Sequence, residues 1–293
     1  MTLRLSRRTA LGAIGAGLLA GCVSPRLAAP LRRPLGLADI TLRRELTRDY
    51  AGTLAKVAAM GFTHFGFRLA DPMPGSSEPP AHDKAAMLRD AGLEMGPVRF
   101  NPRGPNPSRE IAVAAEIGAS IIALTTAPVF ISGGAIGKTT LPEFEAWLPQ
   151  LIALDEEARA AGVTLAYHNH SWDHAPLDGP SPLERIAAET DVRFEIDCAW
   201  AWIGGVAPLA LVEKLGPRVV SMHLKDVDSA RGKSPFEQLV APGLGQLDYA
   251  ALLPNLDRTT DAIGYVEVDN PDDGLAAART AIDFLTAARA RYA

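Results

Sequence analysis

Four short, mostly apolar runs in the second half of the chain each end in a side chain that can bind a metal ion. The side chains are His168, Asp197, His223 and Glu267. Gaps of 29, 26 and 44 residues separate them, about the length of one strand-loop-helix-loop unit. Two imidazoles and two carboxylates at the ends of successive strands can meet around one divalent cation, and the sequence leaves Mn, Zn, Co and Mg open. The spacing therefore predicts a metal site and a parallel α/β fold together.

Further polar and aromatic side chains follow the same runs. His170 shares a strand face with His168, so one could bind the cation while the other contacts substrate. Lys225 follows His223 by two residues and could stabilise negative charge. The candidates for substrate binding are Trp200, Arg68, Asp269 and Asn270, with Trp200 as an apolar wall and Arg68 as an anion or hydroxyl clamp. Each of these side chains also has a structural reading, as a hydrogen-bonded histidine, an ion-paired lysine or a packed tryptophan.

Strand-like and helical patterns alternate eight times. The predicted strands are Leu35–Thr41, Thr63–Arg68, Leu93–Phe100, Ser120–Leu124, Thr164–His168, Arg193–Asp197, Val219–His223 and Tyr265–Val268. The predicted helices are Tyr50–Met60, Asp83–Ala91, Ser108–Ile117, Leu141–Ala161, Pro182–Thr190, Pro208–Leu215, Tyr249–Leu256 and Leu275–Ala290. Several of these helices stop at a glycine, as left-handed caps require. Eight such units favour a single-domain (β/α)₈ TIM barrel over residues 35–293.

An open doubly wound sheet is the alternative fold. It is less favoured because no Gly-x-Gly-x-x-Gly phosphate loop follows the first strand. The long irregular segments follow strands, so in a barrel they would gather at the C-terminal face, where such folds hold their sites.

The first 22 residues have the pattern of an export signal. Arginines at positions 7 and 8 precede an uncharged stretch rich in Ala, Gly and Leu, which favours the twin-arginine route over a short buried helix. Leu19-Ala20-Gly21-Cys22 resembles a lipoprotein processing box with Cys22 as the lipidated residue. Residues 23–34 contain prolines and arginines without periodicity, a pattern that is typical of a flexible tether. The prediction is a periplasmic protein whose only membrane contact is an N-terminal lipid anchor.

Charge and cysteine content narrow the partners. The chain holds 29 basic and 34 acidic residues, for a net charge of −5, and removing the signal would leave −8. An acidic chain without a basic patch argues against nucleic acid as a partner. Cys198 would remain as the only thiol after processing, so no disulfide within the chain is expected.

Five motifs together resemble the sugar phosphate isomerase/epimerase family of xylose-isomerase-like TIM barrels. They are Tyr167-His168-Asn169-His170, Phe194-Glu195-Ile196-Asp197 with Trp200, Met222-His223-Leu224-Lys225-Asp226, Gly243-Leu244-Gly245, and Val266-Glu267-Val268-Asp269-Asn270-Pro271. The resemblance runs from about Leu35 to the C-terminus, and Tyr-His-Asn-His is similar to an exported bacterial branch of the family. It implies a divalent metal held by Glu, Asp, His and Glu. Asp197, His223 and Glu267 take the last three places, while His168 stands where relatives carry the first glutamate.

The predicted reaction is a sugar isomerisation or epimerisation through an enediolate, with Glu267 and His170 as acid/base groups and Lys225 stabilising charge. Because His168 replaces a glutamate, a symmetric two-glutamate epimerisation is disfavoured. A lyase that cleaves keto-glycosides by β-elimination is the first alternative, and a non-catalytic carbohydrate-binding lipoprotein is the second. A phosphodiesterase would need a larger metal cluster and a basic groove. The expected partner is a small carbohydrate, and the chain could also form a homo-oligomer.

Overall fold

The computed structural model describes residues 33–69, 78–100, 106–131, 135–269 and 271–291. These described residues belong to one compact unit. The predicted signal peptide, most of the tether, Cys22 and Asn270 lie outside the described residues. Among the described residues, none of the helices has both the length and the apolar character that a membrane span requires.

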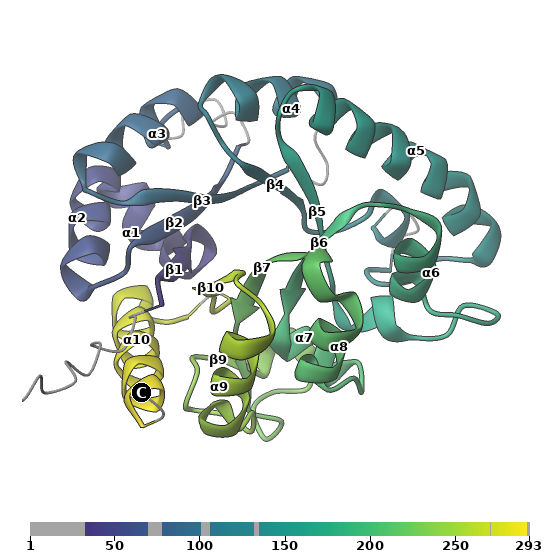
Figure 1. The fold of residues 1–293 in the computed structure, drawn as a ribbon. Coiled ribbons are helices and arrows are strands. Elements are labelled where there is room, and N and C mark those ends of the chain that lie inside the picture. Colours follow the sequence, from purple (N-terminus) through teal and green to yellow (C-terminus); the bar gives the residue numbers. More distant parts are fainter. Residues whose placement is uncertain (1–32, 70–77, 101–105, 132–134, 270, 292–293) are drawn as a thin grey trace, which may run out of the picture. The chain divides into compact units, whose positions relative to one another are not determined.

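Eight parallel strands close into a barrel with helices around it (Figure 1). The strands are β1 (Leu35–Ala38), β2 (His64–Arg68), β3 (Glu94–Arg99), β4 (Ile121–Leu124), β5 (Thr164–His168), β6 (Arg193–Asp197), β7 (Val219–Leu224) and β10 (Ile263–Val266). Each strand pairs with the next along the chain, and β10 pairs with β1 to close the ring. The predicted (β/α)₈ barrel is confirmed. Closure brings the first and last strands together, which matters for the site below.

The helices that follow the strands match the predicted ones to within a few residues. They are α2 (Tyr50–Met60), α3 (Ala81–Asp90), α4 (Pro107–Glu116), α5 (Leu141–Ala160), α6 (Pro182–Glu189), α8 (Pro208–Leu215), α9 (Tyr249–Thr259) and α10 (Gly274–Ala290). Gly61 ends α2 with a left-handed φ of 101°, as the sequence predicted. Capping boxes begin α5 and α6, where Thr140 pairs with Glu143 and Ser181 pairs with Glu184.

The structure differs from the prediction in the bounds of two strands and in three further elements. The eighth strand is Ile263–Val266 instead of Tyr265–Val268, because its ladder with β7 begins at Ile263 and ends at Val266. The first strand stops at Ala38, where a 3-10 turn begins at Asp39. Three elements were not predicted: helix α1 (Arg43–Arg48), helix α7 (Cys198–Ile203), and a hairpin of β8 (Asp226–Val227) with β9 (Leu239–Val240).

One tyrosine fills space inside the barrel next to glycines of other strands. The ring of Tyr265, on β10, is only 3% exposed and lies against Gly36 of β1 and Gly96 of β3. A Cβ atom at either glycine would overlap this ring. The large side chain of Tyr265 therefore fills the space next to Gly36 and Gly96, which have no side chains.

Gly36→Ala should destabilise the barrel by about 1–3 kcal/mol, because the added methyl group must displace a packed ring. Urea unfolding followed by circular dichroism measures the change. Gly36→Ala combined with Tyr265→Leu should recover part of the loss, because the smaller side chain leaves room. An unchanged midpoint for the single variant would contradict the packing described.

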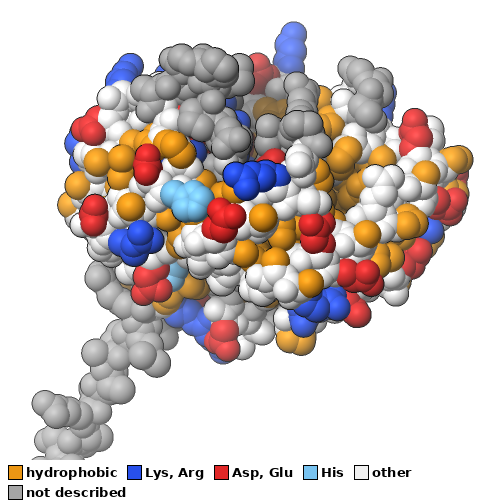
Figure 2. Space-filling view, turned by 90° about the horizontal axis from the view of Figure 1, so that it is seen from above, with side chains coloured by type: hydrophobic (Ala, Val, Ile, Leu, Met, Phe, Trp, Pro, Cys, Tyr) orange, Lys and Arg blue, Asp and Glu red, His pale blue; other side chains and the backbone are white. Residues whose placement is uncertain are grey.

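On the face drawn in Figure 2, acidic and basic side chains are interspersed rather than sorted by sign. Interspersed charges create no directional field that would attract a polyanion to this face.

Candidate active site

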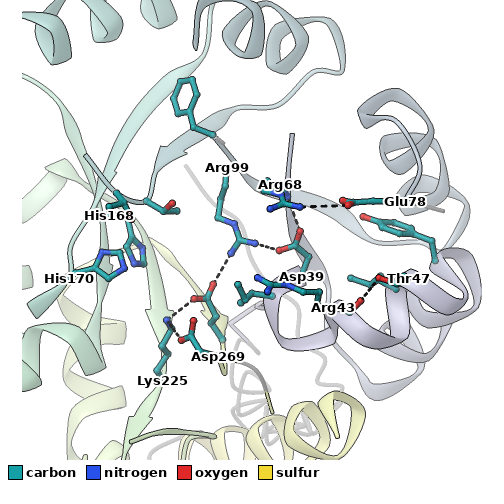
Figure 3. Close-up of a pocket in the computed structure, with 17 residues that line it drawn as sticks. Asp39, Arg43, Thr47, Arg68, Glu78, Arg99, His168, His170, Lys225 and Asp269 are labelled. Carbon is teal, nitrogen blue, oxygen red and sulfur yellow. Dashed lines mark hydrogen bonds and ion pairs between the residues drawn. The ribbon is translucent and has the colours of Figure 1, made fainter. Parts of the chain in front are cut away.

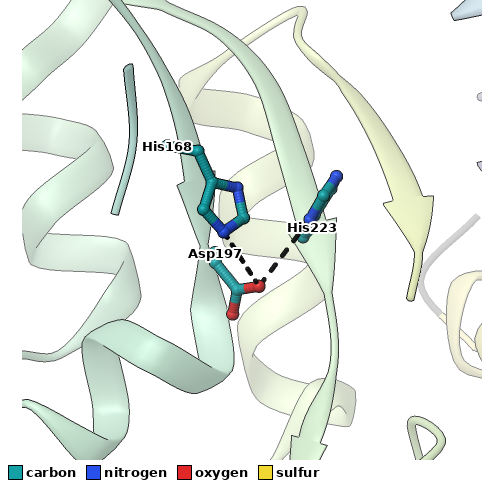
Figure 4. Close-up of side chains that lie close together, drawn as sticks. All are labelled: His168, Asp197 and His223. Atoms are coloured by element: carbon teal, nitrogen blue, oxygen red, sulfur yellow. Dashed lines mark ion pairs between the residues drawn. The ribbon is translucent and has the colours of Figure 1, made fainter. Parts of the chain in front are cut away.

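Three predicted metal ligands meet at the C-terminal ends of neighbouring strands (Figure 4). His168 ends β5, Asp197 ends β6, and His223 lies on β7 directly beside Asp197 in the strand register. One ligand atom from each of the three lies within 4.8 Å of the other two. Asp197 Oδ2 is 3.9 Å from His168 Nε2 and 3.7 Å from His223 Nδ1. All three side chains are buried.

The carboxylate of Glu195 contacts the rings of both His168 and His223. Its Oε1 lies 3.1 Å from His168 Nδ1 and 3.3 Å from His223 Nε2, and its Oε2 accepts a hydrogen bond of 2.8 Å from Ser221. Burial would raise the pKa of Glu195, but His223 and His168 outweigh it and lower the pKa to about 2. An ionised carboxylate on the far nitrogens orients the rings and increases their basicity, as outer partners of metal-binding histidines do.

Glu195→Gln should weaken divalent-metal affinity by about 10- to 100-fold while leaving the fold intact. Titration of the chelated protein with Zn²⁺ or Mn²⁺ against a competing chelator measures this change. Ser221→Ala removes only a neutral partner of the same carboxylate and serves as the matched control. Equal metal affinity in Glu195→Gln and the wild type would remove Glu195 from this role.

Glu267, the fourth predicted ligand, lies just beyond the end of β10. Its Oε2 is 3.3 Å from His223 Nδ1 and accepts a hydrogen bond of 2.8 Å from Arg99 Nη1. Its Oε1 is 2.6 Å from Lys225 Nζ. Burial would raise the pKa of Glu267, but His223, Lys225 and Arg99 outweigh it and hold the pKa well below 4.5. Glu267 is therefore a firmly ionised carboxylate next to the other three groups.

Lys225 joins the carboxylates of the site. Its Nζ is 3.2 Å from Asp197 Oδ2 and 2.8 Å from Asp269 Oδ2, in addition to its contact with Glu267. Burial opposes its charge, yet Asp197, Asp269 and Glu267 outweigh it and raise the pKa of Lys225 well above 10.5. Lys225 is thus a fixed, fully buried cation beside the predicted ligands.

The donor set fits a divalent cation. Asp197 Oδ2 and His223 Nδ1 are both buried without a hydrogen-bond partner among the described residues, although they face each other. Burial lowers the pKa of His223, but Glu195 and Glu267 outweigh it and raise the pKa above 6.5. Among the described residues, the ion pairs of the site contain more carboxylates than lysine and arginine side chains, so the site attracts a further cation. The carboxylates are those of Asp39, Glu195, Asp197, Glu267 and Asp269, and the cations are Arg99 and Lys225. Converging orphan atoms and excess negative charge are what a metal site offers before the ion binds.

His170 lies beside this cluster as a buried imidazole. Its ring centre is 5.0 Å from that of His168 and stacks flat on Trp172 at 4.3 Å. Burial above all, and then His168 and Lys225, hold the pKa of His170 well below 6.5. Its Nδ1 has no hydrogen-bond partner among the described residues, and the side chain lines the pocket. An uncharged imidazole with a free ring nitrogen can accept a proton.

Buried partners fix the segment that carries His170. Asp173 accepts hydrogen bonds from the His170 backbone N–H (2.7 Å) and the Tyr167 hydroxyl (2.6 Å). Asn169 pairs with the backbone of Asp197, accepting from its N–H at 2.8 Å and donating to its carbonyl at 3.3 Å. The Tyr-His-Asn-His segment therefore positions both a predicted base and a predicted ligand.

Trp200 does not form the predicted apolar wall of the pocket. It sits on α7, whose N-terminus is capped by Asp197, and is 1% exposed. Its ring packs against His170 at 5.2 Å and does not line the pocket. Because α7 places this side chain in the core, the Trp200 ring packs against the His170 ring.

The cluster opens into a cavity of about 240 Å³ (Figure 3). The predicted residues that line it are Arg68, His168, His170, Lys225, Glu267 and Asp269. Ligand pockets for drug-sized molecules measure about 300–1,000 Å³, so this cavity suits one small polar molecule.

Arg99 and Asp39 are site residues that were not predicted. Arg99 bridges Asp39 at the end of β1 and Glu267 at the end of β10, as Figure 3 shows. The available signal was position alone, since Arg99 lies one residue before the end of the predicted strand Leu93–Phe100. Asp226, in contrast, is structural, because its carboxylate accepts backbone N–H groups of Gly243, Gly245 and Leu247.

Comparison with known proteins agrees with the barrel. The family described as xylose isomerase-like TIM barrel matches residues 54–288. A sugar phosphate isomerase/epimerase from Parabacteroides distasonis superposes with a TM-score of 0.68 at 20% identity, over 89% of this chain and 96% of that one. L-ribulose 3-epimerase superposes with a TM-score of 0.63 at 18% identity, over 88% and 96%. At these identities the likeness shows the fold alone.

One curated relative is similar in sequence over part of the chain. The rhizopine catabolism protein MocC of Rhizobium meliloti is 29% identical over 131 residues. The match spans 40% of this chain and 40% of that protein.

Proposed function

Because the chain belongs to the xylose isomerase-like TIM barrel family, we propose that it is a metal-dependent sugar isomerase that moves a proton through an enediolate. One observation carries the proposal. The buried atoms of His168, Asp197 and His223 converge beside Glu267 and Lys225. His168, Glu267 and Lys225 line a cavity that suits one small sugar. The ends of barrel strands are where enzymes of this fold hold their chemistry.

His168, Asp197, His223 and Glu267 would hold the cation. A divalent ion there supplies Lewis acidity, which lowers the energy of negative charge developing on the oxygens of a sugar carbonyl and its neighbouring hydroxyl. Replacement of a family glutamate by His168 keeps a donor at that position and removes one negative charge.

His170 takes the proton from the carbon next to the carbonyl. It is the neutral imidazole with a ring nitrogen that lacks a partner among the described residues. Lys225, charged and held by three carboxylates, stabilises the negative charge that appears as the proton leaves. After its proton exchanges with solvent, a single base can protonate the adjacent carbon. A second proton moves from the hydroxyl to the former carbonyl oxygen, which completes an aldose-ketose isomerisation.

Epimerisation would need a second acid on the opposite face of the sugar. Glu267 is the remaining group, but Lys225, Arg99 and His223 already engage its carboxylate, which makes it a better ligand than proton acceptor. This asymmetry favours isomerisation over epimerisation.

Deuterium transfer from solvent tests the proposal. The metal-loaded full chain is incubated in D₂O with a panel of aldoses, ketoses and keto-glycosides, and the products are followed by NMR. Deuterium at the carbon next to the carbonyl of an isomerised sugar is the expected result. Release of an aglycone would instead identify a lyase, and no exchange into any sugar would contradict an enediolate reaction.

We also propose that residues 1–22 direct export by the twin-arginine route, with Cys22 as the lipidated residue of a periplasmic protein. The adjacent arginines and the residues before Cys22 support this proposal. Mass spectrometry of the native protein should find a lipid-modified N-terminus at Cys22. An intact N-terminus in the cytosolic fraction would contradict it.

A further inference from the structure

The cavity has a second end, formed by residues from the N-terminal part of the barrel. At the first end lie His168, His170 and Lys225, and at the second lie Arg43 and Arg68 (Figure 3). Arg99 and Asp39 lie between the two ends and connect them through ion pairs. A molecule whose reacting carbonyl occupies the first end would present its other end to these arginines.

The carboxylates at the second end are already committed to partners. Asp39 pairs with Arg99 and accepts a hydrogen bond of 2.9 Å from the backbone N–H of Arg68. Glu78 pairs with Lys84, whose side chain is fully buried. Neither carboxylate is available to neutralise a further arginine fully.

The two arginines keep donors for a ligand. The nearest nitrogen of Arg68 is 3.7 Å from Glu78, beyond hydrogen-bond distance, and its side chain is 46% exposed. Arg43 is exposed, and its guanidinium has no ion pair or hydrogen bond with any other described residue. The backbone of Arg68 is fixed at both ends, by Asp39 at its N–H and by Lys84 at its carbonyl, so this side chain starts from a set position.

Charge at this end favours an anion. Among the described residues that line this end, Arg43 and Arg68 stand beside two carboxylates, Asp39 and Glu78, which already pair with Arg99 and Lys84. Guanidinium groups match a carboxylate or phosphate by paired hydrogen bonds, and such pairs strengthen where little water is present.

We propose that Arg43 and Arg68 bind a carboxylate at the end of the sugar opposite its carbonyl, so that the substrates are uronic acids and their keto isomers. This inference rests on the proposed function for the role of the first end. A carboxylate carries one negative charge and fits the small cavity better than a phosphate, which carries about 1.5–2 charges at neutral pH. Isomerisation of such a sugar relocates one hydrogen between carbons and one between oxygens and needs no further reactant.

Binding of matched sugars tests the proposal. Isothermal titration of the metal-loaded full chain compares D-glucuronate, D-galacturonate and D-mannuronate with the corresponding hexoses and hexose 6-phosphates. At least one uronate should bind about 10- to 100-fold more tightly than its hexose, as expected for charge-assisted hydrogen bonds. In Arg43→Gln, Arg68→Gln and the double variant this preference should shrink toward about 3-fold or less, because uronate affinity falls further than hexose affinity.

Arg44→Gln is the matched control, because Arg44 is an exposed neighbour on the same helix and does not line the cavity. A panel in which no uronate binds more tightly than its hexose overturns the proposal, as does a preference that survives the double variant. Tighter arginine-dependent binding of a 6-phosphate would overturn the choice of carboxylate. Arginine-dependent uronate binding without deuterium exchange would contradict the proposed reaction only, whereas exchange into hexoses without that preference would contradict this inference only.

Discussion

Asp197→Asn should abolish stoichiometric metal binding and reduce turnover by more than about 100-fold, because ligand loss exceeds the cost of losing an outer partner. Asp197 Oδ2 is the atom that both His168 and His223 face, and it has no hydrogen-bond partner among the described residues. Asparagine keeps the size of the side chain and an oxygen that can still cap α7, where Asp197 Oδ1 now accepts from Trp200 N–H. The charge is removed while the local fold is kept.

Metal content after dialysis, measured by mass spectrometry, and initial rates check this prediction. Asp191→Asn is the matched control, since Asp191 is exposed just before the opposite end of the same strand. Full metal content in Asp197→Asn would remove Asp197 from the ligand set. Loss of metal in both variants would point to a general effect on the fold.

His170→Phe should lower kcat by about 10²- to 10⁴-fold and leave metal content unchanged. The phenyl ring can keep the flat contact with Trp172 that now holds the imidazole at 4.3 Å, but it has no nitrogen to take a proton. The variant therefore separates proton transfer from metal binding. The predicted ligands stay in place because Asp173 binds the His170 backbone and not its ring.

Steady-state rates and metal analysis of the same preparation check this second prediction. His82→Gln is the control, because His82 is exposed on α3 and contacts only Glu116 among the described residues. Unchanged kcat in His170→Phe would assign proton transfer to another group. Loss of metal would instead make His170 part of the binding site.

Much of the fold could be predicted because the pattern of each unit is local. The bounds of β5, β6, α2 and α8 match the prediction. Apolar runs mark the two strands, Gly61 marks the end of α2, and Pro208 and Gly216 mark the two ends of α8. The short helix α7 was missed because six almost entirely apolar residues show no helical periodicity. The hairpin of β8 and β9 was missed because each strand has two residues and the pairing depends on contacts across a loop.

The predicted site residues come together where they sit at the ends of sequential strands. His168, Asp197 and His223 come together because β5, β6 and β7 are neighbours in both sequence and space. Arg99 could not be linked to Glu267 in this way, because the two are 168 positions apart and meet only across the closed barrel. The contacts of Glu195 with His168 and His223 could not be predicted either, because they depend on the register between β5, β6 and β7.

Anomalous diffraction from crystals of the full chain soaked in Zn²⁺ tests the central claim most directly. A single strong peak should lie about 2.0–2.2 Å from atoms of His168, Asp197, His223 and Glu267. That result would place one divalent cation where the four strand ends meet. Saturating Zn²⁺ without a peak at this position, or with its main peak on other side chains, would contradict it.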